Sequence, residues 1–338
     1  MNAINNELEN MKKLKVWDII KIREDYKLIG TTLVFKIKKN HLNKVTEYKS
    51  RLCAQGFAQT MGIDIHKTYA PTGRLNSLRT LIASASHSKL KFHQIDIKSA
   101  FLNAPLSETI YLASLQGLDI DKRKYCLQLK KAPLAWYNRL KEWLNKSQYH
   151  MCKLDLCVFY RLGKHPLWLY IHVDNIALFG NKFDQFKKDI SSELEIKYIG
   201  EAGLLLGIKI YHLDNGISLN QQHFIESVLD LYGMSECKQV STPLTPQDHL
   251  EPATDHEVQE FYKLKINYRS AIRSINFLST ATRPDLLFAV SALSQYLEKT
   301  GIKHWKAFNH VLKYVRNTRY WTTLHQKQQK GSQSIQRC

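Results

Sequence analysis

The chain has 338 residues, of which 44% are apolar, and its 49 lysine and arginine residues against 30 aspartate and glutamate residues give a formal net charge of +19. This composition is typical of a folded protein with room for about two or three subdomains, and it excludes an intrinsically disordered chain. So large a basic excess favours a polyanionic partner, most often nucleic acid. No apolar run is long enough to span a membrane and residues 1–15 lack an apolar signal core, so we expect an intracellular protein, cytoplasmic or nuclear.

The N-terminal part predicts a polar helix over 3–13, followed by a basic β-hairpin. Residues 31–39 read as a strand, 40–43 as a turn, and 47–57 as the partner strand. Lysines recur in both strands, and a charged hairpin taken alone is usually a solvated sheet edge. With the rest of the chain in view, we interpret it as a hairpin that contacts phosphates.

The middle of the chain alternates predicted strands and helices, which indicates an α+β fold. The spacing of apolar residues predicts helices at 76–88, 99–102, 136–146, 183–194 and 224–232. Strands are expected at 92–97, 167–171, 176–179 and 203–212. The runs 167–171 and 176–179 are joined through Asp174 and Asn175, which predicts a hairpin with these two residues at its tip.

The C-terminal part changes to a helical pattern. Prolines at 243 and 246 break the preceding periodicity and predict a boundary loop. Apolar residues then recur at helical spacing, first at Leu286, Val290 and Leu293 and later between 305 and 315. The tail beyond 324 is rich in glutamine, lysine and serine, and we expect it to be disordered.

Two strand-like apolar runs lead into an aspartate, Asp96 in the first and Asp174 in the second. Two carboxylates brought side by side are what a two-metal phosphoryl-transfer site needs. Taken alone, Asp96 could instead cap the helix that follows it, and Asp174 with Asn175 could simply form a tight turn. The amide of Asn175 stands where a second carboxylate would complete an acidic pair.

A series of short motifs lies between residues 17 and 324. They are YKSRLCAQGF at 48–57, GID at 62–64, YAP at 69–71, QIDIKSAFLN at 94–103, HVDN at 172–175, LGI at 206–208, STP at 241–243, YRS at 268–270, TRPD at 282–285 and HW at 304–305. Because it carries these motifs in this order, the chain resembles the reverse transcriptase of copia-type long-terminal-repeat retrotransposons. That enzyme is part of a Pol polyprotein of these transposable elements.

The resemblance implies an α+β right-hand polymerase, with fingers, palm and thumb and a helical connection-like C-terminal region. We expect a helical thumb over about 183–232. The expected divisions are a polar N-terminal segment, the reverse transcriptase domain, a linker, the helical connection-like region and a disordered tail, at 1–16, 17–240, 241–262, 263–324 and 325–338.

The resemblance also assigns roles to residues at the matching positions. Asp96, Asp174 and Asn175 would occupy the catalytic positions, with Asp96 and Asp174 as ligands of Mg²⁺ or Mn²⁺. The Ile97 carbonyl would take part in nucleotide binding by helping to hold the ion on the nucleotide side. The implied chemistry is two-metal nucleotidyl transfer, in which a primer hydroxyl attacks the α-phosphate of a nucleotide.

Further residues would bind the incoming nucleotide. Lys49 and Arg51 would face the triphosphate of a dNTP, and the partners would be an RNA template and a DNA primer, with no membrane involved.

The chain departs from the family pattern at three places. The box that normally ends in two aspartates ends in Asp174 and Asn175, and His172 replaces its usual tyrosine. A short segment that forms part of the nucleotide pocket in the family is missing before Pro133. The sequence also ends near the point where ribonuclease H would begin.

These departures predict an RNA-directed DNA polymerase whose catalysis is impaired. Two alternatives stay open at this point: a non-catalytic nucleic-acid-binding remnant, and an inert product of a degenerate element. Metal-dependent primer extension separates the impaired polymerase from the non-catalytic remnant. Cooperative unfolding separates both of these from the inert product.

Overall fold

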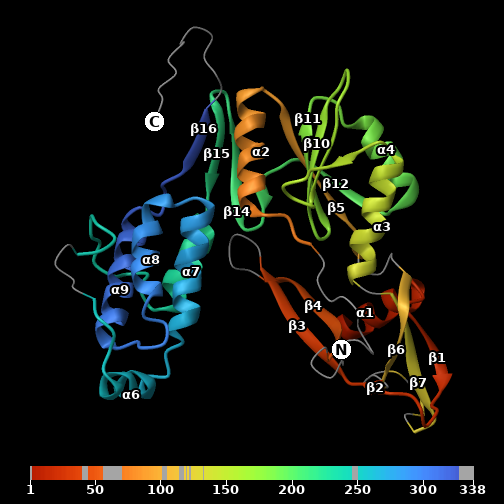
Figure 1. The fold of residues 1–338 in the computed structure, drawn as a ribbon, viewed down its shortest axis with the longest axis horizontal. Helices are drawn as coiled ribbons and strands as arrows, with labels where there is room; N and C mark the ends of the chain where they lie inside the picture. Colours follow the sequence, from red (N-terminus) through yellow and green to blue (C-terminus); the bar gives the residue numbers. More distant parts are fainter. Residues whose placement is uncertain are drawn as a thin grey trace. The chain divides into compact units, whose positions relative to one another are not determined.

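The computed structural model describes residues 2–39, 45–55, 71–100, 105–113, 118, 120–121, 123–131, 133–245 and 250–326. The chain divides into two compact units, and each unit is made of two stretches of sequence (Figure 1). The first combines Met1–Ser77 with His93–Gly200, and the second combines Leu78–Phe92 with Glu201–Cys338. None of the described helices has the length and apolar character that crossing a bilayer requires. Helices and strands alternate through both units, which confirms the predicted α+β class.

The first unit is built on a six-stranded sheet with the strand order β12-β5-β11-β10-β9-β8. Its strands are, in chain order, β5 (Lys91–Ile97), β8 (His150–Met151), β9 (Val158–Arg161), β10 (Leu167–His172), β11 (Asn175–Gly180) and β12 (Ile196–Glu201). Strands β10 and β11 form the predicted antiparallel hairpin, with His172 opposite Asn175. This register places Val173 and Asp174 at the tip and makes Asn175 the first residue of β11.

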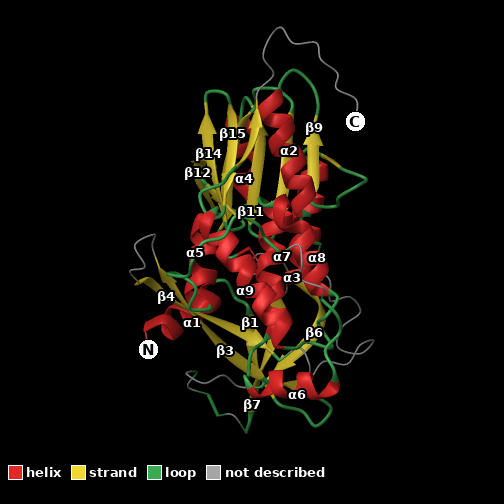
Figure 2. Ribbon diagram, turned by 90° about the vertical axis from the view of Figure 1, so that its left-hand side faces the viewer, coloured by secondary structure: helices red, strands yellow, loops and turns green. Residues whose placement is uncertain are grey.

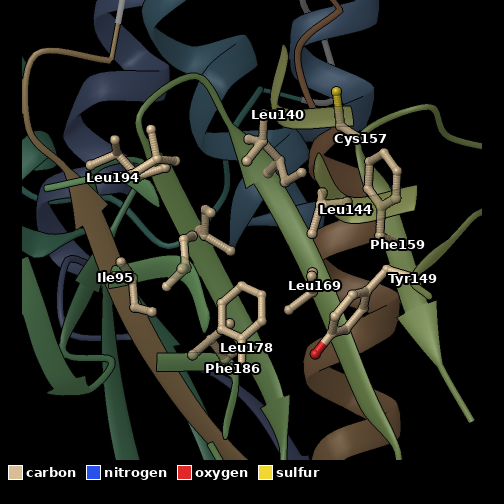
Figure 3. Packing of buried hydrophobic residues seen from close by; sticks show 14 of the residues in the cluster. Ile95, Leu140, Leu144, Tyr149, Cys157, Phe159, Leu169, Leu178, Phe186 and Leu194 are labelled. Atoms are coloured by element: carbon tan, nitrogen blue, oxygen red, sulfur yellow. The ribbon is translucent and has the colours of Figure 1, made fainter. Parts of the chain in front are cut away.

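One face of this sheet carries the core of the first unit. Helices α3 (Pro133–Lys146) and α4 (Asp184–Glu193) cover that face (Figure 1). Buried side chains from both helices and from the central strands form one apolar cluster, which includes Ile95, Leu140, Leu144, Leu169, Leu178 and Phe186 (Figure 3). Because successive strand residues point to opposite faces, the polar Gln94 and Asp96 lie on the face that these helices leave open.

A smaller sheet with the order β1-β7-β6-β2 packs with the N-terminal helix of the same unit. Its strands are β1 (Trp17–Lys21), β2 (Leu28–Ile29), β6 (Pro105–Leu112) and β7 (Tyr125–Lys131). The amphipathic helix α1 (Asn2–Lys13) buries Leu8 and Met11 in the cluster that these strands complete. Strand β7 ends at Lys131 and α3 begins at Pro133, so a single residue, which lies outside the described residues, joins them.

The predicted basic hairpin is present as a separate two-stranded sheet of β3 (Thr31–Lys39) and β4 (Val45–Ala54). Its register sets Lys36 opposite Lys49. The hydroxyl of Ser50 donates a hydrogen bond of 2.8 Å to the Ala3 carbonyl, which ties the hairpin to α1. The residues predicted as its turn lie outside the described residues.

The second unit contains a four-stranded sheet that the sequence did not predict. Its order is β13-β14-β15-β16, and its strands are β13 (Leu204–Leu205), β14 (Ile208–Leu213), β15 (Gly216–Asn220) and β16 (Thr323–Gln326). The single strand predicted over 203–212 is wrong, because Leu206 and Gly207 both have positive φ, 53° and 76°, and reverse the chain. A two-residue reversal of this kind turns one apolar run into a hairpin.

The helical thumb predicted over 183–232 is also wrong. Only α4 and α5 (Gln222–Leu231) are helical there, and four strands separate them. In β14 the alternating residues Ile208 and Ile210 are both buried, and the strand pairs with β13 and β15 in a ladder that satisfies its backbone groups. Pairing with β16, which lies more than a hundred residues later, completes this sheet.

Helices make up most of the rest of the second unit. They are α2 (Leu75–His87, of which residues from Leu78 belong to this unit), α6 (Asp255–Lys263), α7 (Tyr268–Ala281), α8 (Leu287–Ser294) and α9 (Ile302–Asn317), with a 3-10 turn at Pro284–Leu286. Helices α7, α8 and α9 lie together around one apolar cluster (Figures 1 and 2). The predicted helical C-terminal region is therefore present, although α6 falls largely within 241–262, the range expected as a linker. Of the predicted tail, 325–326 belong to β16 and the remainder lies outside the described residues.

Candidate active site

Asp96 and Asp174 lie at neighbouring strand ends in the six-stranded sheet. Asp96 is the last residue but one of β5, and Asp174 lies in the turn that leads into β11, the strand beside β5. The main-chain N–H of Ile97 donates a hydrogen bond of 2.8 Å to the carbonyl oxygen of Asp174. Both aspartates are half-buried. Main-chain pairing thus brings together two acidic residues that are far apart in the sequence.

The turn that carries Asp174 is strained. Val173 is its first residue and has φ of +62°, a left-handed conformation that β-branched residues rarely adopt. In two-residue hairpin turns with positive φ at this position, glycine is the usual residue. Backbone strain of this kind persists only where the surroundings hold the chain in place.

Trp136 holds the turn from helix α3. Its indole Nε1–H donates a hydrogen bond of 2.9 Å to the Val173 carbonyl, and its side chain is only 2% exposed. The apolar body of the indole lies in the cluster beneath the sheet while its one donor reaches the turn. The helical face predicted from the sequence thus includes a residue that positions the turn of Asp174.

Asn175 is held by hydrogen bonds on both sides of its amide. Its Nδ2–H₂ group donates to Oδ1 of Asp174 at 2.8 Å, and its Oδ1 accepts from Nε2 of Gln94, also at 2.8 Å. Gln94 is 5% exposed and lies in β5. A carboxylate can only accept hydrogen bonds when ionised, so the direction of this short network is fixed by Asp174.

The chain just before α2 packs against Tyr170 of β10. The hydroxyl of Tyr170 donates a hydrogen bond of 2.7 Å to the carbonyl of Gly73, and burial raises the pKa of this tyrosine above its ordinary value. A Cβ atom at Gly73 would lie 2.5 Å from the Tyr170 ring, so no larger residue fits there without a shift. The Arg74 N–H donates to Asp155 at 3.0 Å and completes the attachment.

The residues predicted to bind the triphosphate lie in a different sheet from the two aspartates. Lys49 and Arg51 both belong to β4, and the Arg51 side chain is exposed. The Lys49 side chain lies outside the described part of the structure. The role of the Ile97 carbonyl, like the contacts of Lys49 and Arg51 with a nucleotide, stays a prediction.

The acidic residues fit a magnesium ion that is shared with a phosphate. Magnesium prefers oxygen ligands and in such sites takes one or two carboxylates together with substrate phosphates. Asp96 and Asp174 can supply these carboxylates. Within the described part of the chain, no group of three or more histidine, cysteine, aspartate or glutamate residues is gathered that could hold a metal by itself. The expected third catalytic position offers no carboxylate, because Asn175 carries a neutral amide. The Oδ1 of this amide already accepts a hydrogen bond from Gln94.

Three residues around these aspartates were not singled out for this role from the sequence. Gln94 stands two residues before Asp96, so strand periodicity already places it on the same face. Trp136 and Gly73 carry no such signal, because their roles depend on contacts with β10 and with the turn that follows it.

Comparison with known proteins identifies the family of this chain. The family described as reverse transcriptase (RNA-dependent DNA polymerase) matches residues 14–246. The Retrovirus-related Pol polyprotein from transposon TNT 1-94 of Nicotiana tabacum is 30% identical over 337 residues, which cover 94% of this chain and 25% of that protein.

Two further relatives match over the same share of the chain. The Retrovirus-related Pol polyprotein from transposon RE1 of Arabidopsis thaliana is 27% identical over 94% of this chain and 22% of its own length. The Transposon Ty1-BL Gag-Pol polyprotein of Saccharomyces cerevisiae is 21% identical over 94% of this chain and 19% of its own length. The chain thus spans a quarter or less of these relatives, and its similarity to them identifies it as a member of the reverse transcriptase family, a reverse transcriptase domain of the copia-type retrotransposons.

Proposed function

We propose that this chain carries the nucleotidyl-transfer core of an RNA-directed DNA polymerase, and that its catalysis is impaired. The observation that carries the proposal is the hydrogen bond from Ile97 to Asp174, which sets Asp96 beside the turn of Asp174. In this reading the six-stranded sheet with α3 and α4 is the palm, and the β3–β4 hairpin belongs to the fingers. Helices α7 to α9 form the connection-like region.

The proposed reaction joins a dNTP to a DNA primer on an RNA template inside the cell. Asp96 and Asp174 would hold Mg²⁺ or Mn²⁺, and the Ile97 carbonyl would help to hold the ion on the nucleotide side. A bound divalent cation in such a site supplies Lewis-acid stabilisation of phosphate oxygens and lowers the pKa of an attacking hydroxyl. The chain itself contributes the rigid placement of the two carboxylates, and Lys49 and Arg51 would meet the charge of the triphosphate.

Two features support the impairment. Asn175 is neutral, so the acidic pair lacks a neighbouring third carboxylate to offset two divalent cations. The join between β7 and α3 is a single residue, which leaves no room there for the nucleotide-pocket segment that the family resemblance leads us to expect. Positioning of reacting groups can contribute about 7–11 kcal/mol to a reaction of this type, so a partial loss of the pocket would be costly.

Primer extension on a poly(rA)/oligo(dT) template tests the proposal, with Mg²⁺ and then Mn²⁺. We expect weak extension by the native chain, none by Asp96→Ala, and a gain in Asn175→Asp. Extension at rates usual for the family would contradict impairment. No extension from either the native chain or Asn175→Asp would contradict the polymerase assignment itself.

A second candidate function is nucleic-acid binding without catalysis. The observation that favours it is the β3–β4 hairpin, which exposes Lys36 and Arg51 together with the aromatic rings of Phe35 and Tyr48, 63% and 66% exposed. Basic side chains contact phosphates, and exposed aromatic rings stack on bases. Retained binding by Asp96→Ala, with no extension by any variant, would favour this function.

A further inference from the structure

We propose that Asn175 is a positioning residue whose neutral amide donates a hydrogen bond to the Asp174 carboxylate and thereby keeps the acidic site intact without a divalent cation. Gln94 in turn orients Asn175, and we call these two residues the amide pair. The inference rests on the proposed function, since it concerns the carboxylate that would bind the catalytic cation. It makes Asn175 a competitor of that cation instead of a ligand.

The contacts that carry this inference are short and are made by side chains with little freedom. Gln94 is 5% exposed, and the two hydrogen bonds that link Gln94, Asn175 and Asp174 both measure 2.8 Å. The backbone on each side is also fixed, because Asn175 pairs with His172 and Ile97 bonds to Asp174. The amide pair is therefore built into two adjacent strands and does not lie on a loose surface.

The direction of these hydrogen bonds decides what Asn175 can do. The Asp174 carboxylate needs a donor, so the Asn175 amide must turn its nitrogen toward Asp174 and its oxygen toward Gln94. The oxygen is then engaged by the Gln94 donor. For Oδ1 of Asn175 to ligate a cation held by Asp174, the amide would have to rotate, because its nitrogen faces Asp174 and its oxygen faces Gln94. The rotation breaks both bonds and leaves a nearly buried donor of Gln94 without a partner.

Charge explains why an amide suits this position when no cation is present. An aspartate at 175 would set a second carboxylate within hydrogen-bond distance of Asp174, and adjacent carboxylates resist ionising together unless a cation neutralises them. The Asn175 amide replaces this repulsion with a hydrogen bond to a charged acceptor, which is stronger than one between neutral groups. A cation that approaches Asp174 must displace this bond, so the amide pair weakens metal binding.

Metal binding to the full chain tests the inference without depending on polymerase activity. We would titrate Mn²⁺ and follow water-proton relaxation for the native chain, Asn175→Ala and Asn175→Asp. Removal of the competing amide should make Asn175→Ala bind Mn²⁺ about tenfold more tightly than the native chain, a gain of about 1.4 kcal/mol. Asn175→Asp should bind more tightly still, because it adds a carboxylate ligand.

Thermal unfolding gives a second, independent readout. In EDTA, Asn175→Asp should melt below the native chain, and Mn²⁺ should raise its midpoint by more than it raises the native midpoint. A matched control is Asn138→Asp, which adds the same charge at an exposed position of α3. This control should match the native chain in both measurements. If Asn175→Ala does not fold, Asn175→Leu, which keeps the size of the side chain but has no hydrogen-bond donor, takes its place.

The outcomes separate this inference from the proposed function. Weaker or unchanged Mn²⁺ binding in Asn175→Ala would overturn the inference, since a ligand or a merely structural residue would give that result. A native chain that extends primers and binds Mn²⁺ as tightly as Asn175→Asp would also overturn it, while the proposed function stands. The expected order of affinities without any primer extension would uphold the inference and contradict the function alone.

Discussion

Arg283 is the most completely enclosed cation of the second unit among the residues that the structure describes. Its side chain is 2% exposed, and it forms a two-pronged ion pair with Asp285, with N···O distances of 2.9 and 2.7 Å. It also donates to the carbonyl and hydroxyl of Thr318 at 3.1 and 2.6 Å. Burial raises the pKa of Asp285, but the hydrogen bonds and charge of Arg283 outweigh this and hold it below its ordinary value. The pair thereby joins the end of α7 to the end of α9.

Removing one partner of this ion pair should destabilise the protein more than replacing both partners with apolar residues. Asp285→Ala leaves a buried guanidinium without its counter-charge, and we expect the free energy of unfolding to fall by about 3–5 kcal/mol. The double variant Arg283→Met/Asp285→Leu removes both charges and should be clearly more stable than the single variant. Urea denaturation measures both. A double variant no more stable than Asp285→Ala would show that the ion pair itself stabilises the unit.

His304 makes stability depend on pH in the second unit. Its ring is fully buried, Nδ1 accepts from the Gly301 N–H at 2.9 Å, and Nε2 lies 3.0 Å from the Glu251 carbonyl, to which it can donate. This arrangement uses the neutral ring, and burial, the largest cause, lowers the pKa of His304. The unfolded chain therefore takes up a proton at a higher pH than the folded chain does.

The sign of the effect follows from this difference. Stability contributed by neutral His304 is present above the unfolded pKa of about 6.5 and is lost as the pH falls through the lower folded value. We expect the melting midpoint to fall between about pH 7.5 and 5.5, and to fall less steeply in His304→Gln. Some slope should remain, because burial also lowers the pKa of His325. An unchanged slope in His304→Gln would contradict the assignment.

At the scale of elements, helix α3 and the β10–β11 hairpin depend on each other through Trp136. Trp136→Phe keeps most of the apolar volume but removes the donor to the Val173 carbonyl, so we expect a loss of about 1–3 kcal/mol in the free energy of unfolding. Trp143→Phe is the matched control, since Trp143 lies on the same helix and packs against the same cluster.

Amide hydrogen exchange across 167–180 distinguishes a local effect from a global one. The strained Val173 turn should exchange faster in Trp136→Phe and not in Trp143→Phe. Equal exchange in the two variants would mean that the turn is held by other contacts.

At the scale of the whole molecule, the net charge of +19 makes salt the main variable for binding nucleic acid. If the β3–β4 hairpin contacts phosphates, Lys36→Gln/Arg51→Gln should lower the slope of log K against log salt by about 2, since each lost contact removes about 0.9. Lys153→Gln/Lys164→Gln removes two exposed charges elsewhere and is the control. The same slope in both variants would indicate diffuse attraction and no specific hairpin contact.

Local patterns in the sequence predicted the helices, strands and hairpins that form within one short stretch of chain. The strand at 31–39 coincides with β3, the predicted helix 136–146 lies within α3, and the β10–β11 hairpin holds Asp174 at its tip. Their periodicity of apolar residues is set by their own backbone geometry, so it can be read without knowing any partner. The same patterns could not predict β16, whose partner β15 is remote in sequence.

In the candidate site, too, some features were readable from the sequence and others depended on the folded chain. The sequence by itself determined the two aspartates, the neutral residue at 175 and the basic hairpin, because residue type and strand periodicity are local properties. Only the tertiary structure decided that the Asn175 amide bonds Asp174 and Gln94, and that Trp136 holds the strained turn. These contacts join residues from β5, α3 and the β10–β11 hairpin, and hydrogen bonds between such separate elements depend on distances that only the folded chain sets.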